Sequence, residues 1–394
     1  MLDVVPGPRD LIARLRRSPR LLGALAVAVV LVAAATLDVP GRLAGLAPTG
    51  TPTTGASSAT PSSAPSTQAP RLVPLTNADN RLLDRCTPGS DRLARCGPAP
   101  ALGEGTWLNT PGGGTASLDD LRGSVVLVDF FSGSCLSCRR AARYVTAWQR
   151  AYADAGLQVV GVHSPERAYE KDDRWLARAL DDLAITFPVL QDQGYATLTD
   201  YRTQVLPSTY LVDTSGTVRA ISLGEGGAER TERLLRQLLQ ERDLDAPLPA
   251  PIGALDDGED PEPGTTGQID LADSRGTRVD SESDTVVGDD TRFRLPSTAQ
   301  PDGTFSLGGL WTTGTEYLVP RDRAVARVSY RGRAAYQLVG GSGTLTVTTS
   351  SGMTRRIVVD GDPEPRQVHV APFGPETLTV RYDGDLRVYA FSFG

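Results

Sequence analysis

The chain has 394 residues, enough for two or three folded domains of ordinary size. Its hydrophobic (40%) and charged (22%) fractions are close to a globular average, which excludes a wholly disordered chain and a protein with many membrane spans. The net charge of −7 argues against a nucleic-acid partner, because nucleic-acid-binding domains carry a basic face. The acidity is concentrated in residues 243–290, where fourteen Asp and Glu face two Arg.

The N-terminal region predicts a membrane segment. Residues 21–37 are apolar or small and uncharged, near the lower length limit for a bilayer-spanning helix. The arginine-rich residues 1–20 precede them, which predicts a cytoplasmic N-terminus and an extracytoplasmic remainder. The alternative is a cleaved signal peptide with a small-residue cleavage site at residues 33–35, which would leave a secreted protein. Both interpretations export the rest of the chain, so disulfides are chemically allowed.

Residues 38–99 are expected to tether the folded domains to this anchor. Within residues 48–70, 22 of 23 positions are Pro, Ser, Thr, Ala or Gly, a composition that cannot bury a core. Cys86 and Cys96 then flank a Pro-Gly turn. In an exported chain this spacing favours a structural disulfide, with an electron relay to the second cysteine pair as the alternative.

Residues 100–242 alternate between apolar runs and helical patterns. A strand–helix–strand unit followed by a hairpin and a terminal helix predicts an α/β domain, a mixed sheet with helices on both faces. We expect strands at 125–131, 157–163, 187–190, 208–213 and 217–223, and helices at 138–155, 166–184 and 227–242.

The sequence Ser134-Cys135-Leu136-Ser137-Cys138 lies between an expected strand and an expected helix. A cysteine at a helix start meets unsatisfied backbone N–H groups that favour the thiolate, and a second cysteine one turn later can resolve a mixed disulfide. The spacing therefore favours redox catalysis over a permanent small-loop disulfide or a metal site. No zinc spacing and no c-type haem motif is present, so we expect no metal and no cofactor.

Two further residues fit the same chemistry. Asp129 ends a buried strand, where a carboxylate with a raised pKa can accept the proton of Cys138; an exposed strand-end carboxylate is the alternative. Pro207 opens a strand, which suits a cis peptide bond beside the sulfurs; an ordinary trans proline is the alternative.

His163 is the last residue of the expected strand 157–163, and Glu166 follows three residues later. The carboxyl ends of such strands line the active face of open α/β sheets, so Glu166 is a candidate active-site neighbour. A charge that complements a helix dipole is the favoured alternative for Glu166. His163 is interpreted as a packed strand-end residue rather than a base.

Residues 291–394 change pattern to short alternating runs bounded by Gly and Asp-Gly. Such runs predict an all-β antiparallel sandwich, in which Asp-Gly pairs form hairpin turns. The acidic residues 243–290 are interpreted as the linker before it.

Three sequence stretches carry a family resemblance. SVVLVDFFSGSCLSCRR, VVGVHSPE and LPSTYLVDTSGTVR resemble a thioredoxin fold of the TlpA type, and residues 107–123 are similar to the N-terminal hairpin of that type. From about residue 100 onward the arrangement resembles the extracytoplasmic part of DipZ proteins. The resemblance implies that Cys135 attacks, Cys138 resolves, Asp129 is the buried carboxylate and Pro207 is the cis-proline.

The resemblance also extends to the C-terminal domain, which in DipZ proteins is similar to carbohydrate-binding modules of jelly-roll-like fold. Trp311, Tyr317 and Tyr336 are then candidates for a surface that binds a cell-wall glycan, with core packing as the favoured alternative. DipZ proteins also carry a multi-span electron-transfer domain. This chain has one apolar span without cysteine, which implies a separate membrane thiol partner.

We therefore expect a membrane-anchored extracytoplasmic thiol–disulfide oxidoreductase. It would act on disulfide-bearing or dithiol envelope proteins, as a reductant that serves them or cytochrome maturation. The rival hypothesis is a non-catalytic envelope glycan-binding module with a vestigial thioredoxin fold. Peroxidase activity is a third and weaker hypothesis, because a Cys-x-x-Cys pair suits dithiol exchange better than peroxide reduction.

Overall fold

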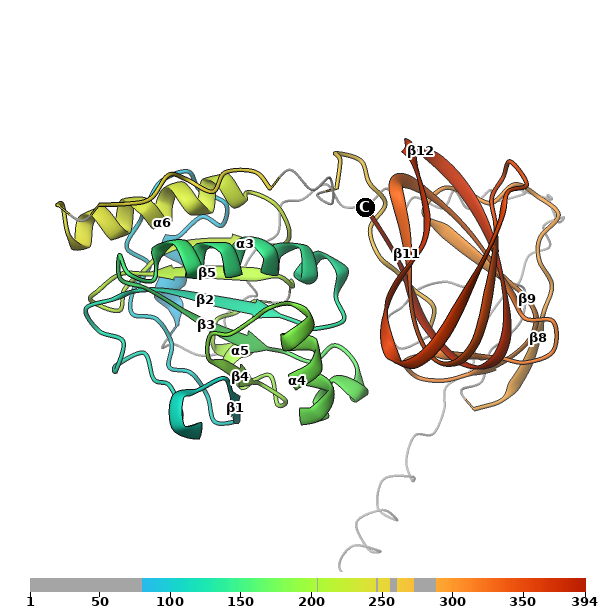
Figure 1. Ribbon diagram of the computed structural model, residues 1–394, viewed down its shortest axis with the longest axis horizontal. Coiled ribbons are helices and arrows are strands. Elements are labelled where there is room, and N and C mark those ends of the chain that lie inside the picture. The colour runs from blue at the N-terminus through green and yellow to red at the C-terminus, as the bar shows by residue number, and fades with distance from the viewer. Residues whose placement is uncertain (1–79, 204, 246, 256–260, 273–287) are drawn as a thin grey trace, which may run out of the picture. The chain divides into compact units, whose positions relative to one another are not determined.

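The computed structural model describes residues 80–394 except 204, 246, 256–260 and 273–287 (Figure 1). All described residues belong to one unit of the chain, Thr67–Gly394. The expected membrane span 21–37 lies outside the described residues. Within the part of the chain that is described, no helix is long and apolar enough to cross a bilayer.

The first domain is built on a six-stranded mixed sheet with the order β1-β4-β3-β2-β5-β6. The three strands β2, β3 and β4 run parallel, and the other three are antiparallel to their neighbours. The strands are β1 (Thr106–Leu108), β2 (Val125–Phe131), β3 (Leu157–His163), β4 (Val189–Gln191), β5 (Ser208–Val212) and β6 (Val218–Leu223). All seven residues of β2 are buried, which explains why six of them are apolar, with Asp129 as the exception.

Helices cover this sheet (Figure 1). They are α3 (Leu136–Tyr152), α4 (Asp173–Asp182), α5 (Ala196–Asp200) and α6 (Ala228–Arg242), with short 3-10 helices η1 (Arg81–Arg85), η2 (Pro111–Gly113) and η3 (Ala168–Lys171). Apolar residues of α3, α4 and α6 form one core with Val125, Leu127 and Phe131 of β2. The alternate residues Val126 and Val128 belong to a second core with Leu83 of η1. Because side chains alternate along a strand, these two cores lie on opposite faces of the sheet.

Two sequence predictions fail locally in this domain. Residues 107–123 do not form a hairpin: β1 pairs antiparallel with β4 at the sheet edge, and η2 and turns follow it. The helix expected at 166–184 is split, because the Asp172 carboxylate accepts hydrogen bonds from the N–H groups of Arg174 and Trp175 and so starts α4 there. The short helix α5 was not expected.

The segment after α6 is in part fixed to the first domain. The carboxylate of Glu232 on α6 is buried and accepts hydrogen bonds from the N–H groups of Ile252 (2.6 Å) and Gly253 (2.8 Å) and from the Tyr152 hydroxyl (2.5 Å). Residues around 252 therefore pack as a strap rather than as a free linker.

The second domain has one sheet with the order β10-β12-β11-β9-β8, and β7 pairs with β12. Its strands are β7 (Ile269–Asp270), β8 (Asp290–Phe293), β9 (Thr304–Thr313), β10 (Leu318–Pro320), β11 (Val325–Thr348) and β12 (Thr354–Phe393). The long strands bend, so that Val380 of β12 pairs with both Ala326 and Val347 of β11. β10 also pairs with β9, which closes the sheet.

This closed, barrel-like sheet corrects the jelly-roll-like sandwich expected from the sequence. Alternating strands with Gly-bounded turns fit both architectures, and only the long-range pairings distinguish them. The boundary also moves. Since β7 already pairs with β12, the domain begins by Ile269 and not at residue 291.

Candidate active site

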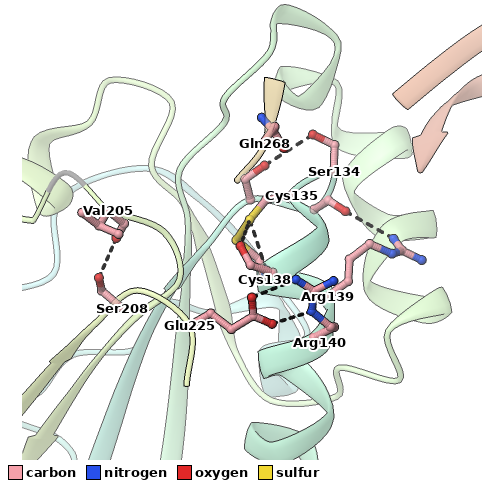
Figure 2. The surroundings of a disulfide bond; sticks show 12 residues. Ser134, Cys135, Cys138, Arg139, Arg140, Val205, Ser208, Glu225 and Gln268 are labelled. Atoms are coloured by element: carbon pink, nitrogen blue, oxygen red, sulfur yellow. Dashed lines mark hydrogen bonds and ion pairs between the residues drawn. A yellow bond between two sulfur atoms is a disulfide. The ribbon is translucent and has the colours of Figure 1, made fainter. Parts of the chain in front are cut away.

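A disulfide joins Cys135 and Cys138 at the start of α3 (Figure 2). Cys135 is the N-cap residue of α3, and its Sγ accepts a hydrogen bond from the Cys138 backbone N–H at 3.1 Å. The Ser137 hydroxyl lies 3.2 Å from the same sulfur. Cys135 is 7% exposed and Cys138 1%, so the first cysteine is the more accessible. A thiolate at Cys135 would be stabilised by the N–H groups of the helix N-terminus.

Asp129 is a buried residue of β2. Because side chains alternate along a strand, the Asp129 side chain points to the same face of the sheet as those of Leu127 and Phe131. It therefore faces the core that also contains Cys138. The residue is 2% exposed, and burial raises the pKa of its carboxyl to about 7. Its Oδ1 has no hydrogen-bond partner among the described residues. A carboxylate in this setting can take up and release a proton near neutral pH.

The Leu206–Pro207 peptide bond is cis and lies directly before β5. The turn is fixed by the Ser208 hydroxyl, which donates to the Val205 carbonyl at 2.5 Å (Figure 2). The Gly224 N–H also donates to the Pro207 carbonyl at 2.8 Å. A groove of about 470 Å³ runs beside Pro207. Its walls include Tyr144 and Trp148 of α3 and Glu225 of the loop after β6.

The first turn of α3 is tied to that loop. Arg140 donates to both carboxylate oxygens of Glu225, at 2.5 and 2.8 Å, and its side chain is buried (Figure 2). The guanidinium charge of Arg140 is therefore neutralised by Glu225 rather than directed at the sulfurs. Arg139 donates to the Gly133 carbonyl at 3.2 Å.

Comparisons with known proteins fit this geometry. Residues 104–221 match the AhpC/TSA family, and residues 269–394 match the family described as Thioredoxin like C-terminal domain. Over 146 residues the chain is 30% identical to the thiol-disulfide oxidoreductase YkuV of Bacillus subtilis. The aligned region covers 36% of this chain and 95% of YkuV. The chain belongs to the thioredoxin-like thiol–disulfide oxidoreductases.

This oxidoreductase is also 36% identical over 323 residues to the protein DipZ of Mycobacterium tuberculosis. The aligned region covers 81% of this chain and 46% of DipZ. The similarity thus extends through both described domains. The chain spans about half the length of the DipZ proteins that it matches.

The second disulfide of the oxidoreductase joins Cys86 and Cys96. Both residues belong to the core on the far face of the sheet from Cys135 and Cys138. The backbone N–H of Cys96 donates to the Val218 carbonyl of β6 at 2.9 Å, so the bridge fixes the entering segment to the sheet edge. The separation by the sheet supports a structural role over an electron relay.

Glu166 and His163 occupy the loop end of β3 as expected. Glu166 is half-buried. His163 is fully buried, with its ring 5.5 Å from the Phe131 ring. Glu170 is hydrogen-bonded to the cysteine loop, since its carboxylate accepts from the Ser134 hydroxyl at 2.6 Å. No local pattern singled out Glu170, because the two serines that donate to it, Ser132 and Ser134, lie 38 and 36 residues away in the chain.

The aromatic residues of the C-terminal domain do not form the expected sugar platform. Trp311 is fully buried, donates its Nε1–H to the Gly308 carbonyl at 2.9 Å and packs 5.1 Å from the Tyr382 ring. It occupies an inward position of β9, so the alternation of the strand places it in the core. Tyr317 and Tyr336 are half-buried, and the Tyr336 hydroxyl accepts from Gln367.

Proposed function

We propose that this enzyme is a membrane-anchored, extracytoplasmic thiol–disulfide oxidoreductase that reduces substrate disulfides through Cys135 and Cys138. The observation that carries the proposal is the Cys135–Cys138 pair at the N-terminus of α3, with Asp129 facing the same core and cis-Pro207 before β5. These are the parts that dithiol exchange requires: an activated thiol, a resolving thiol and a proton acceptor.

In the first step of the proposed reaction the Cys135 thiolate attacks one sulfur of a substrate disulfide. The substrate S–S bond breaks, a mixed disulfide forms, and the leaving substrate sulfur takes up a proton. The backbone N–H of Cys138, which now donates to Cys135 Sγ, holds the attacking sulfur at the helix start.

In the second step Cys138 attacks Cys135 Sγ and breaks the mixed disulfide. The second substrate sulfur leaves as a thiolate, so the substrate gains two electrons and the cysteine pair is oxidised to the disulfide seen in the structure. Cys138 is 1% exposed, so water has little access to its proton. Asp129 is the proposed acceptor of that proton, because its pKa of about 7 suits transfer near neutral pH.

The proposed location and partners come from the N-terminal sequence. Residues 21–37 would anchor the enzyme, with the catalytic domain outside the cytoplasmic membrane. The proposed substrates are disulfide-bearing envelope proteins, including apoproteins of cytochrome maturation, and a membrane thiol protein would return the pair to the dithiol form. We do not propose a glycan partner, because Trp311 of the expected sugar site is a core residue.

Trapping of mixed disulfides tests the proposal directly. A Cys138→Ser variant lacks the resolving sulfur and should accumulate substrates linked through Cys135. A Cys135→Ser variant should accumulate none. Natively folded variants that trap nothing, together with a wild-type protein that fails to reduce insulin, would overturn the function. Trapping through Cys138 in the Cys135→Ser variant would reverse the roles of the two sulfurs.

A further inference from the structure

A buried polar cluster lies beneath the loop that leads into Cys135. Glu170 is fully buried, and its carboxylate accepts hydrogen bonds from Ser132 Oγ at 2.7 Å and Ser134 Oγ at 2.6 Å. His163 Nε2 lies 3.3 Å from Glu170 Oε2. We call these four residues the Glu170 cluster. They come from three places: the loop after β2, the end of β3, and η3.

Both oxygens of the Glu170 carboxylate are hydrogen-bond acceptors. Ser132 Oγ donates to one and Ser134 Oγ to the other, which is the pattern of a carboxylate that carries no proton. His163 Nδ1 is buried without a hydrogen-bond partner among the described residues. This fits a neutral imidazole with its proton on Nε2, because a proton on Nδ1 would be a buried, unsatisfied donor. The tautomer is thus assigned from the hydrogen-bond pattern.

The cluster therefore carries one negative charge. Among the described residues, His163 is the only cationic type within ion-pair distance of Glu170. Because that imidazole is assigned as neutral, the charge has no counter-ion. Ser134, which donates to the carboxylate, is the residue directly before Cys135. The charge thus lies one hydrogen bond and one residue away from the attacking cysteine.

A fixed negative charge near Cys135 affects the two redox states differently. The reduced pair carries a thiolate, and a like charge disfavours it. The disulfide carries no charge, so the oxidised state is not penalised. A redox pair whose reduced form is destabilised gives up its electrons more readily, the reverse of strong oxidants whose reduced form is stabilised.

We propose that Glu170, held by Ser132, Ser134 and His163, is a positioning residue that sets the reduction potential of Cys135–Cys138 on the reducing side. The proposal rests on the proposed function and adds a structural cause for its direction. Asp129 and Glu170 then have different tasks. Asp129 exchanges a proton with the buried sulfur, and Glu170 keeps a constant charge behind the exposed one.

The test is a Glu170→Gln variant, in which a neutral amide of similar shape replaces the carboxylate. The full-length protein is equilibrated in buffers of defined reduced and oxidised glutathione, and the dithiol fraction is measured by alkylation and mass. The pair should become harder to oxidise: the equilibrium constant should shift about tenfold, which corresponds to a potential about 30 mV less negative. The Cys135 thiolate, followed by the pH dependence of its alkylation rate, should form at lower pH.

Two variants serve as controls. Glu232→Gln removes a second buried, hydrogen-bonded carboxylate of the same domain, which lies on α6 and contacts the strap around residue 252. The equilibrium constant of this variant with glutathione should stay within twofold of the wild-type value. Glu170→Asp retains the charge and should restore most of the wild-type potential, which loss of packing alone would not predict.

The outcomes separate the inference from the proposed function. A folded Glu170→Gln variant with an unchanged potential would overturn the inference, while insulin reduction by the wild type would still support the function. If Glu170→Gln does not fold, the triple variant Glu170→Met with Ser132→Ala and Ser134→Ala removes the charge together with its two hydroxyl donors, so that only His163 Nε2 loses its partner. It should show the same shift, and a potential equal to that of the wild type would equally refute the inference.

Discussion

The two disulfides of this enzyme have similar Cα–Cα distances and are similarly buried, but the groups around their sulfurs differ. The Cα–Cα distance is 5.3 Å for Cys86–Cys96 and 5.2 Å for Cys135–Cys138. The more exposed cysteine of the first pair, Cys86, is 5% exposed, and that of the second, Cys135, is 7% exposed. Cys135 caps the N-terminus of a 17-residue helix, whereas Cys86 caps the C-terminus of a five-residue 3-10 helix. The helix dipole thus favours a thiolate at one pair and disfavours it at the other.

The comparison teaches that reactivity here depends on local donors and charges rather than on exposure. The active pair has a backbone N–H directed at its sulfur, with Asp129 in the same core and the Glu170 cluster beneath the preceding loop. At the other pair, the N–H of Cys96 is used in pairing with β6. The predictions below test this contrast.

The largest effect is expected from the active pair itself. Cys135→Ser should reduce insulin reductase activity by more than about 1000-fold, because the remaining sulfur of the pair, that of Cys138, is 1% exposed and has little access to a substrate disulfide. The double variant Cys86→Ser/Cys96→Ser should retain activity within about twofold. Insulin turbidity assays on both variants measure this difference, and a similar loss in the two would show that the bridges act together as a relay.

Asp129→Asn should slow the second chemical step more than the first. Loss of the proton acceptor is expected to reduce the rate of mixed-disulfide resolution about 100-fold at pH 8, with a smaller effect on the initial attack. Rapid-quench measurement of the mixed disulfide resolves the two steps. The wild-type resolution rate should rise as the pH passes about 7, where Asp129 loses its proton. A pH profile that is identical in the variant would argue against this role.

The same substitution should change stability with a defined sign. Burial raises the folded-state pKa of Asp129 from 3.8 to about 7, so between these values the folded protein holds a proton that the unfolded chain releases. The contribution of Asp129 to stability is therefore lost as the pH rises through this window. Asp129→Asn should be more stable than the wild type at pH 8, by roughly 2–4 kcal/mol, and close to it at pH 4. Urea unfolding at both pH values checks the sign.

Removal of the structural bridge should cost stability but not reactivity. The bridge closes a loop with a sequence separation of ten, for which chain entropy predicts a loss of about 2–3 kcal/mol in Cys86→Ser/Cys96→Ser. Graded reductant should open Cys135–Cys138 before Cys86–Cys96 in the wild type. Equal midpoints for the two bridges in alkylation assays would contradict the contrast drawn between them.

The sequence predicted the parts of this site that depend on local patterns. The strands 125–131 and 157–163 match β2 and β3 residue for residue, because buried strands of a mostly parallel sheet are rich in apolar residues. The Cys-x-x-Cys pair at a helix start and the inward direction of Asp129 follow from the same local rules. To predict these features, one needs only the two-residue period of strand side chains and the order of strands and helices along the chain.

Long-range pairings could not be predicted in this way. Ser134 and Glu170 are 36 residues apart and meet only through the packing of η3 against the end of β2. The closure of the second domain depends on residues of β11 that pair with two stretches of β12. Whether Trp311 packs in the core or lines a surface depends on the register of its strand, which the local sequence does not determine; the structure places it in the core.

The smallest expected effect concerns the hydroxyl beside the attacking sulfur. Ser137 Oγ lies 3.2 Å from Cys135 Sγ, close enough to donate a hydrogen bond to the thiolate once the disulfide opens. Ser137→Ala removes this donor but leaves the Cys138 N–H and the helix N-terminus in place. We therefore expect a modest change: about a fivefold slower alkylation of Cys135 at pH 7, since one hydrogen bond to the sulfur is worth about 1 kcal/mol. Ser215→Ala, in the turn between β5 and β6, is the matched control and should have no effect. A tenfold or larger loss in Ser137→Ala would mean that this hydroxyl, and not the helix N-terminus, is the main source of the difference between the two disulfides.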